Sequence, residues 1–187
     1  MSSFLPRSYS NQTCVELRQD PIKLDIPAHG GVGSRSNAYL HNGAPPVATL
    51  RTAGVRLALG TDSSASNADL SLFAEATAVR ALDPGITAEE LLRMVTLTGA
   101  ELLGVADSFG ALRPGAQADL VVVRASDARG SDPTAAFLEA GAAGAVEAVM
   151  AGGEWRIRDC VPTADTSELT RASDDVRAHA RELIASE

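Results

Sequence analysis

The residue best suited to chemistry is Asp62, which follows a short apolar run over residues 55–59 and a glycine, Gly60. The run predicts a buried strand that ends in a carboxylate. In parallel α/β folds, active residues gather at the C-terminal ends of strands. A carboxylate there can bind a cation through oxygen, or move a proton between a water and a leaving group. The pattern alone leaves open a second interpretation, in which Asp62 only caps the following helix.

Helical spacing surrounds this strand and would position its end. A helix is predicted between Pro46 and Gly54, a second over residues 68–82, a third from the capping box that begins at Thr87, and a short fourth over residues 99–103. Glu75 falls on the second helix, where we expect it on a solvated face or in a buried salt bridge rather than in a catalytic role.

After residue 112 the apolar spacing changes from helical to alternating. Residues 120–123 predict a strand, and residues 146–150 and 154–157 flank a Gly-Gly pair as the two arms of a hairpin. Residues 167–185 carry the apolar stripe of a final helix. The order of elements favours an α/β fold with a small β unit attached.

The first 33 residues give fewer signals. Residues 22–26 alternate apolar and charged side chains, as a half-buried strand does. Gly30, Gly31 and Gly33 then indicate a turn-rich link.

The composition excludes some classes of function. Lysine plus arginine is 16 and aspartate plus glutamate is 24, so the net charge is −8, and an acidic chain repels the phosphates of nucleic acids. The chain contains no run of eighteen apolar residues, so no membrane span is predicted. Cys14 and Cys160 form neither a CxxC pair nor a disulfide framework, which favours a reduced, cytoplasmic setting.

A family resemblance spans residues 34–160. It is carried by Ser-Arg-Ser-Asn at 34–37, Leu-Gly-Thr-Asp-Ser at 59–63, Ala-Ser-Asn at 65–67, Gly-Ala at 99–100 and Ala-Asp-Leu-Val-Val at 118–122. In order and spacing these stretches resemble the last barrel segment of the amidohydrolase superfamily, in its aminohydrolase (deaminase) branch. The later stretches resemble the return of the chain into that family's small β-sandwich.

The resemblance implies a distorted (β/α)8 barrel and hydrolysis of C–N or C–Cl bonds, often the deamination of a purine nucleoside or a related ring. In that family one divalent metal, zinc or iron, activates water. Asp62 matches the last-strand aspartate, which is a metal ligand and a proton shuttle. Ser36 and Asn37 match residues that shape the substrate pocket, and Ser66 and Asn67 are further candidates for contact with a small-molecule substrate.

The chain departs from the family in its histidines. The family has a His-x-His pair and two further histidines, whereas this chain has only His29, His41 and His179, and none forms such a pair. We expect His29 and His41 to be loop histidines rather than metal ligands, and the two cysteines to have no role. Because a hydrolytic site needs about three or four protein ligands, the chain alone is expected to bind no metal and to be inactive.

The predicted organisation is therefore a fragment of an α/β barrel. Residues 34–112 would be the C-terminal part of the barrel, 113–160 a portion of the β-sandwich and 161–187 a terminal helix, while 1–33 are unassigned and do not resemble the family. A partial barrel exposes strand edges, so a homo-oligomer is expected. Two alternatives remain: a non-catalytic association module, and a truncated or frame-shifted gene product.

Overall fold

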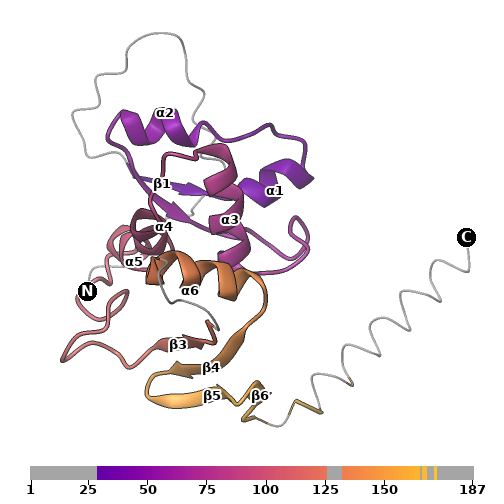
Figure 1. The fold of residues 1–187 in the computed structure, drawn as a ribbon, viewed down its shortest axis with the longest axis vertical. Coiled ribbons are helices and arrows are strands. Elements are labelled where there is room, and N and C mark those ends of the chain that lie inside the picture. Colours follow the sequence, from indigo (N-terminus) through magenta and orange to yellow (C-terminus); the bar gives the residue numbers. More distant parts are fainter. Residues whose placement is uncertain (1–28, 126–131, 165, 168–170, 172–187) are drawn as a thin grey trace, which may run out of the picture.

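The computed structural model describes residues 29–125, 132–164, 166–167 and 171. Its first unit is a parallel strand–helix–strand crossover made of β1 (His29–Val32), α1 (Ser34–Tyr39), α2 (Val47–Thr52) and β2 (Arg56–Leu59). The two strands pair in parallel along all four of their residues (Figure 1). Parallel pairing brings the residues that follow each strand to the same edge of the sheet.

The strand β1 corrects the expectation of a turn-rich link. Gly30 and Gly31 are paired with Leu57 and Ala58 of β2, and His29 lies in the strand rather than in a loop. Glycines carry no side chains that could show the alternation typical of a strand, so the pattern in the sequence was misleading. The pairing partner that makes this segment a strand lies far along the chain.

Three helices follow β2: α3 (Leu72–Leu82), α4 (Ala88–Val95) and α5 (Leu97–Leu102). The predicted stop after Leu82 and the capping box of α4 are confirmed, since Thr87 and Glu90 exchange both capping hydrogen bonds. The helix α3 begins later than the predicted residue 68. Ser71 is its N-cap, with its hydroxyl accepting from the backbone N–H of Ala74 at 3.2 Å.

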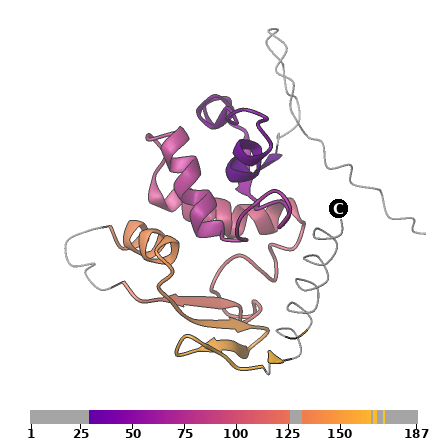
Figure 2. The same cartoon turned by 90° about the vertical axis from the view of Figure 1, so that its right-hand side faces the viewer.

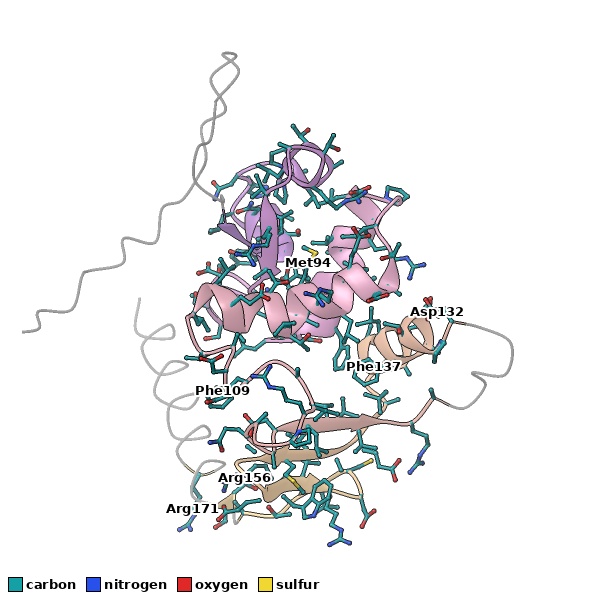
Figure 3. All side chains as sticks on the ribbon, turned by 90° about the vertical axis from the view of Figure 1, so that its left-hand side faces the viewer. Met94, Phe109, Asp132, Phe137, Arg156 and Arg171 are labelled. Atoms are coloured by element: carbon teal, nitrogen blue, oxygen red, sulfur yellow. The ribbon has the colours of Figure 1, made fainter. Side chains whose placement is uncertain are left out.

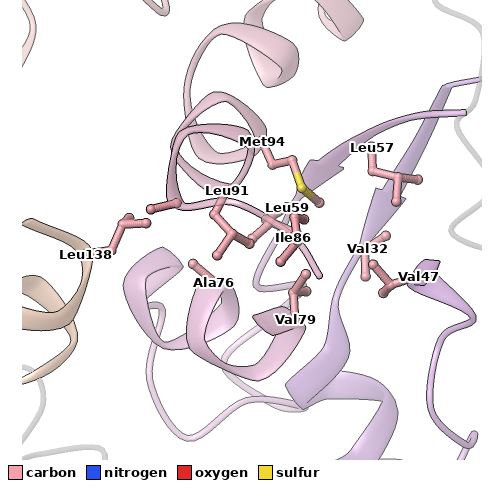
Figure 4. Close-up of a cluster of buried hydrophobic side chains, with 11 residues drawn as sticks. Val32, Val47, Leu57, Leu59, Ala76, Val79, Ile86, Leu91, Met94 and Leu138 are labelled. Atoms are coloured by element: carbon pink, nitrogen blue, oxygen red, sulfur yellow. The ribbon is translucent and has the colours of Figure 1, made fainter. Parts of the chain in front are cut away.

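The apolar core lies where β1 and β2 meet the helices (Figure 4). Leu91 of α4 is 1% exposed and Val79 of α3 is 0% exposed, which makes them two of the most deeply buried side chains. Burial of this apolar surface fixes the end of β2 against α3 and α4. The cluster comprises Val32, Val47, Leu57, Leu59, Ala76, Val79, Ile86, Ala88, Leu91, Met94 and Leu138.

The second unit is an antiparallel sheet in the order β3 (Leu120–Val123), β4 (Val146–Ala151), β5 (Glu154–Arg158) and β6 (Val161–Pro162). The predicted hairpin is confirmed: β4 and β5 pair on either side of Gly152 and Gly153, whose φ angles are 60° and 82°. Positive φ at both turn residues is what a type I′ two-residue hairpin turn requires.

The helix α6 (Pro133–Ala142) was not predicted. It begins with Asp132, whose carboxylate caps the N–H of Thr134 at 2.9 Å, and with a proline in the first turn. Figure 2 shows α6 between the sheet and the other helices. Its Phe137, labelled in Figure 3, meets the ring of Phe73 edge-on with the ring centroids 5.4 Å apart. This aromatic pair packs α6 against α3.

Some expectations fall outside the described residues. These are the strand over 22–26, nearly all of the helix over 167–185, and the side chains of Cys14 and His179. Within the described part of the chain, no helix is both long and apolar enough to cross a membrane.

Candidate active site around Asp62

The Asp62 carboxylate is held by two hydroxyl groups. Ser36 Oγ, on α1, donates to Asp62 Oδ2 at 2.8 Å, and Ser66 Oγ, from the loop after β2, donates to the same oxygen at 2.5 Å. The parallel pairing of β1 and β2 brings these residues together, because α1 follows β1 and Asp62 follows β2. Both hydroxyls bind Oδ2, so among the described residues Oδ1 accepts no side-chain hydrogen bond.

These contacts lower the pKa of Asp62. The largest effect is the hydrogen bond from Ser66, followed by the one from Ser36, with a smaller contribution from the backbone N–H of Ser63. Ser36 and Ser66 are 4% and 5% exposed, whereas Asp62 itself is exposed. Asp62 is thus an accessible carboxylate that is oriented by two buried hydroxyl groups and stays ionised at neutral pH. Such a group can accept a proton or bind a cation.

Asp62 also has an uncommon backbone conformation, with φ at 61°. Left-handed backbone is rare outside glycine, although aspartate tolerates it better than most residues. The interpretation of Asp62 as a helix cap is wrong, because Ser71 caps α3. Non-glycine residues in this conformation persist where their surroundings hold them, and they concentrate at functional sites.

A buried polar group lies beside this site. Glu75 is 0% exposed; its Oε1 accepts from Asn67 Nδ2 at 2.8 Å and its Oε2 accepts from the backbone N–H of Arg35 at 3.2 Å. Asn67 Nδ2 also donates to the backbone carbonyl of Thr61 at 3.0 Å. Of the two expectations for Glu75, the solvated face is wrong and burial is confirmed, but its hydrogen-bond partners in the described part of the chain are an amide and a backbone N–H rather than a charged side chain. Because α3 begins at Leu72, Glu75 falls in its first turn, next to the loop that carries Asp62.

An ion pair also links α1, which follows β1, to the loop that follows β2. Arg35 Nη1 and Nη2 donate to the two carboxylate oxygens of Asp69 at 2.5 and 3.0 Å. The hydrogen bond from Arg35 lowers the pKa of Asp69. Neither this pair nor the contacts of Glu75 could be found from the sequence, because their partners are distant along the chain.

The structure unites only some of the predicted site residues. Ser36 and Ser66 donate to Asp62 directly, and Asn67 donates to the carbonyl of Thr61, the residue before Asp62. No side-chain hydrogen bond joins Asn37 to this group in the described part of the chain. Whether any of these residues contacts a substrate stays a prediction.

The described residues do not supply a complete site for the family's metal. Asp62 offers one carboxylate, but residues 29–125, 132–164, 166–167 and 171 contain no group of three or more His, Cys, Asp and Glu side chains placed to hold a metal ion. His41 is exposed, with φ at 55°, and Cys160 is an exposed free thiol. A mononuclear hydrolytic site needs three protein ligands or more. The donor set therefore does not fit that metal by itself.

A model of the amidohydrolase family matches residues 13–156. The chain belongs to the amidohydrolase family. The match begins at residue 13, so it corrects the view that residues 1–33 have no resemblance to the family. It also includes β1, the strand that the sequence pattern did not predict.

Two curated relatives of this amidohydrolase family member are named as deaminases. The 5-methylthioadenosine/S-adenosylhomocysteine deaminase of Teredinibacter turnerae is 39% identical over 127 residues, which is 61% of this chain and 28% of the relative. The enzyme of the same name from Moorella thermoacetica is 37% identical over 119 residues, 59% of this chain and 28% of the relative. The chain thus spans little more than a quarter of the length of these enzymes.

Solved structures of the family share the fold. An adenosine deaminase from Xanthomonas campestris with bound zinc superposes with a TM-score of 0.73 at 30% identity, covering 82% of this chain and 38% of that one. The atrazine chlorohydrolase of Arthrobacter aurescens, complexed with zinc, gives 0.64 at 27% identity, covering 78% and 35%. These neighbours support a mixed α/β fold and a divalent metal in the family.

Proposed function

We propose that this chain is the C-terminal portion of a metal-dependent deaminase and supplies part of its active site. Its chemical contribution would be Asp62, a carboxylate that accepts a proton from the attacking water and serves as one ligand of the metal. The observation that carries the proposal is the geometry of Asp62: exposed, hydrogen-bonded through one oxygen by Ser36 and Ser66, and low in pKa. A base needs to be ionised, accessible and oriented before it can act.

The proposed place of this chain in a full enzyme is the end of a (β/α)8 barrel and part of its β-sandwich. The parallel pair β1 and β2, each followed by helices, would be the last two strand–helix units. The antiparallel sheet from β3 to β6 would belong to the sandwich. The superposition on a zinc-bearing adenosine deaminase supports this assignment.

The proposed reaction is hydrolysis of a C–N bond in an adenosine-type compound. The names of the curated relatives support it, with 5-methylthioadenosine and S-adenosylhomocysteine as the compounds to test. The proposed setting is cytoplasmic, without nucleic-acid or membrane partners. Because the described residues offer one carboxylate and no complete ligand set, we propose that the isolated chain is inactive.

A second candidate function is association without catalysis. The incomplete donor set of the described residues favours it, since a fold segment can be kept for contact with another chain. The two candidates differ in what they require of Asp62. Catalysis depends on its charge, whereas association does not.

The test is a chimera with the Teredinibacter turnerae deaminase, in which the aligned segment of this chain replaces that enzyme's own. Ammonia release from 5-methylthioadenosine is measured with zinc present. We expect turnover by the chimera, none by the chain alone, and a loss of turnover of about three orders of magnitude or more in the Asp62→Asn chimera. Asp107→Asn, at an exposed loop carboxylate, is the matched control and should leave the rate unchanged.

The outcomes separate the two candidates. Equal turnover by the unmodified chimera and by the Asp62→Asn chimera would contradict the catalytic proposal. A chimera that folds, binds zinc and releases no ammonia would favour association. Ammonia release by the isolated chain with zinc would show that the chain recruits ligands beyond Asp62.

A further inference from the structure

The buried carboxylate of Glu75 has no part in the chemistry described above, yet it is costly to bury. It is fully enclosed in the first turn of α3, beside the apolar Ala76 and Val79. Burying a carboxylate is strongly unfavourable unless hydrogen bonds replace those it made with water. Both oxygens of Glu75 have such partners, and the two partners come from different segments of the chain.

The hydrogen bonds of Glu75 connect, directly or through Asn67, with the backbone of the residues that precede Ser36 and Asp62. Oε2 accepts from the backbone N–H of Arg35, which precedes Ser36. Oε1 accepts from Asn67 Nδ2, and the same nitrogen donates to the carbonyl of Thr61, which precedes Asp62. Two buried side chains, Glu75 and Asn67, thus join the backbone of Arg35 to that of Thr61, and the residues that follow these two positions form the Ser36–Asp62 hydrogen bond.

We propose that Glu75 is a positioning residue: its carboxylate joins the start of α1 to the loop after β2 and so holds Asp62 against Ser36 and Ser66. The proposal rests on the proposed role of Asp62. The left-handed backbone of Asp62 is a conformation that its surroundings must maintain. The Arg35–Asp69 pair also joins the two segments, but Asp69 is more than half exposed, and exposed ion pairs contribute little.

Glu75→Gln is the substitution that isolates this role. The amide has nearly the shape of the carboxylate, but one of its two terminal atoms is a donor instead of an acceptor. It can therefore accept from Arg35 N–H or from Asn67 Nδ2, and its own NH2 group faces the other donor. One of the two connections must be lost. Glu89→Gln, on the exposed face of α4, is the matched control.

The test is NMR spectroscopy of the full chain, because it reads the site without requiring activity. In Glu75→Gln we expect the backbone carbon shifts of Asp62 to move away from left-handed values, and the Arg35 amide to exchange with solvent about tenfold faster. The methyl resonances of Val79 and Leu91 in the core should stay in place. Glu89→Gln should leave all of these signals unchanged.

Two further measurements keep the proposal testable if Glu75→Gln does not fold. In the unmodified chain, a scalar coupling across the hydrogen bond should connect the Arg35 amide nitrogen with the Glu75 carboxyl carbon. Asn67→Ala removes the hydrogen bonds of Asn67 to Glu75 and to Thr61 but leaves the one from the Arg35 N–H to Glu75, so it should shift Asp62 more than Arg35. Absence of the coupling, or unmoved Asp62 signals in a folded Glu75→Gln or Asn67→Ala chain, would overturn the proposal.

The active chimera supplies the kinetic readout. There Glu75→Gln should lower kcat with little change in KM, because the base is displaced while substrate contacts remain. A lowered KM and an unchanged kcat would contradict the proposal. If the unmodified chimera is inactive, the proposed function fails, but the NMR results still decide whether Glu75 positions Asp62.

Discussion

Ser36 Oγ and Asp62 Oδ2 are 2.8 Å apart, although the two residues are separated by 26 positions in the sequence. They follow neighbouring parallel strands, so the pairing of β1 with β2 sets their distance. This relationship makes the protonation of Asp62 sensitive to the groups that donate to it. It can be tested one hydroxyl at a time.

Removing either hydroxyl should raise the pKa of Asp62. Each hydrogen bond stabilises the ionised form, so its loss moves the pKa up toward the ordinary value. Ser66→Ala should have a larger effect than Ser36→Ala, because the Ser66 hydrogen bond is the larger cause. A pH titration of the Asp62 carboxyl carbon by NMR measures both. Ser64→Ala, at an exposed neighbouring serine, should have no effect; equal pKa values in all four chains would contradict the prediction.

The sequence predicted the local features of this fold and missed the distant ones. The α4 capping box and the β4–β5 hairpin were predictable because their hydrogen bonds join near neighbours. The strand β1 was missed, since its glycines acquire their conformation from pairing with β2. The helix α6 was missed even though Asp132 and Pro133 form a helix start, because its apolar face packs on both α3 and α4 and shows no simple stripe.

The same division applies to the site. Asp62 could be singled out because it ends an apolar strand. The resemblance to the family pointed to Ser36 and Ser66, but the sequence did not show that both would donate to one oxygen. The burial of Glu75 could not be predicted, because its hydrogen-bond partners Arg35 and Asn67 belong to other segments of the chain.

Arg51 should stabilise the fold in a pH-dependent way. Arg51 Nε donates to Asp83 Oδ2 at 2.8 Å, and this hydrogen bond lowers the pKa of the buried Asp83. A folded pKa below the unfolded one means that the stabilisation is present above the unfolded pKa of about 3.9 and is lost as pH falls. Arg51→Met should therefore lower Tm most at neutral pH.

Thermal unfolding from pH 7 down to acid checks this prediction. The Tm difference between Arg51→Met and the unmodified chain should shrink as the pH falls through the folded pKa of Asp83. Arg93→Met, at an exposed arginine of α4, should change Tm little at any pH. A Tm difference that grows as the pH falls would show that the predicted pH dependence has the wrong sign.

Gly141 should tolerate no larger residue. A Cβ built there would lie 2.4 Å from the Phe73 ring, which is shorter than van der Waals contact allows. Gly141→Ala should therefore destabilise the chain by about 1–3 kcal/mol, through displacement of α6 from α3. Gly99, a helical glycine with open space around it, is the matched control. Gly99→Ala should be neutral or stabilise by up to about 1 kcal/mol in urea unfolding.

The small parallel sheet should lead to association. The sheet formed by β1 and β2 has two strands in the described part of the chain, and unpaired strand edges pair with other chains. We expect sedimentation velocity to show dimers or larger species that dissociate on dilution. A monomer of 19.3 kDa at the highest attainable concentration would count against this expectation.

The contrast between the two sheets has a consequence for the order of folding events. The strands β4 and β5 are joined by two glycines, so they can pair within the time of a local hairpin, about 1–10 μs. The strands β1 and β2 are separated in the sequence by a crossover that contains α1 and α2, and closing this longer segment has a larger entropic cost. We therefore expect pulse-labelling hydrogen exchange to protect the amides of β5 before those of β2. The Asp62 carboxylate would then reach its position late, after the distant hairpin is complete.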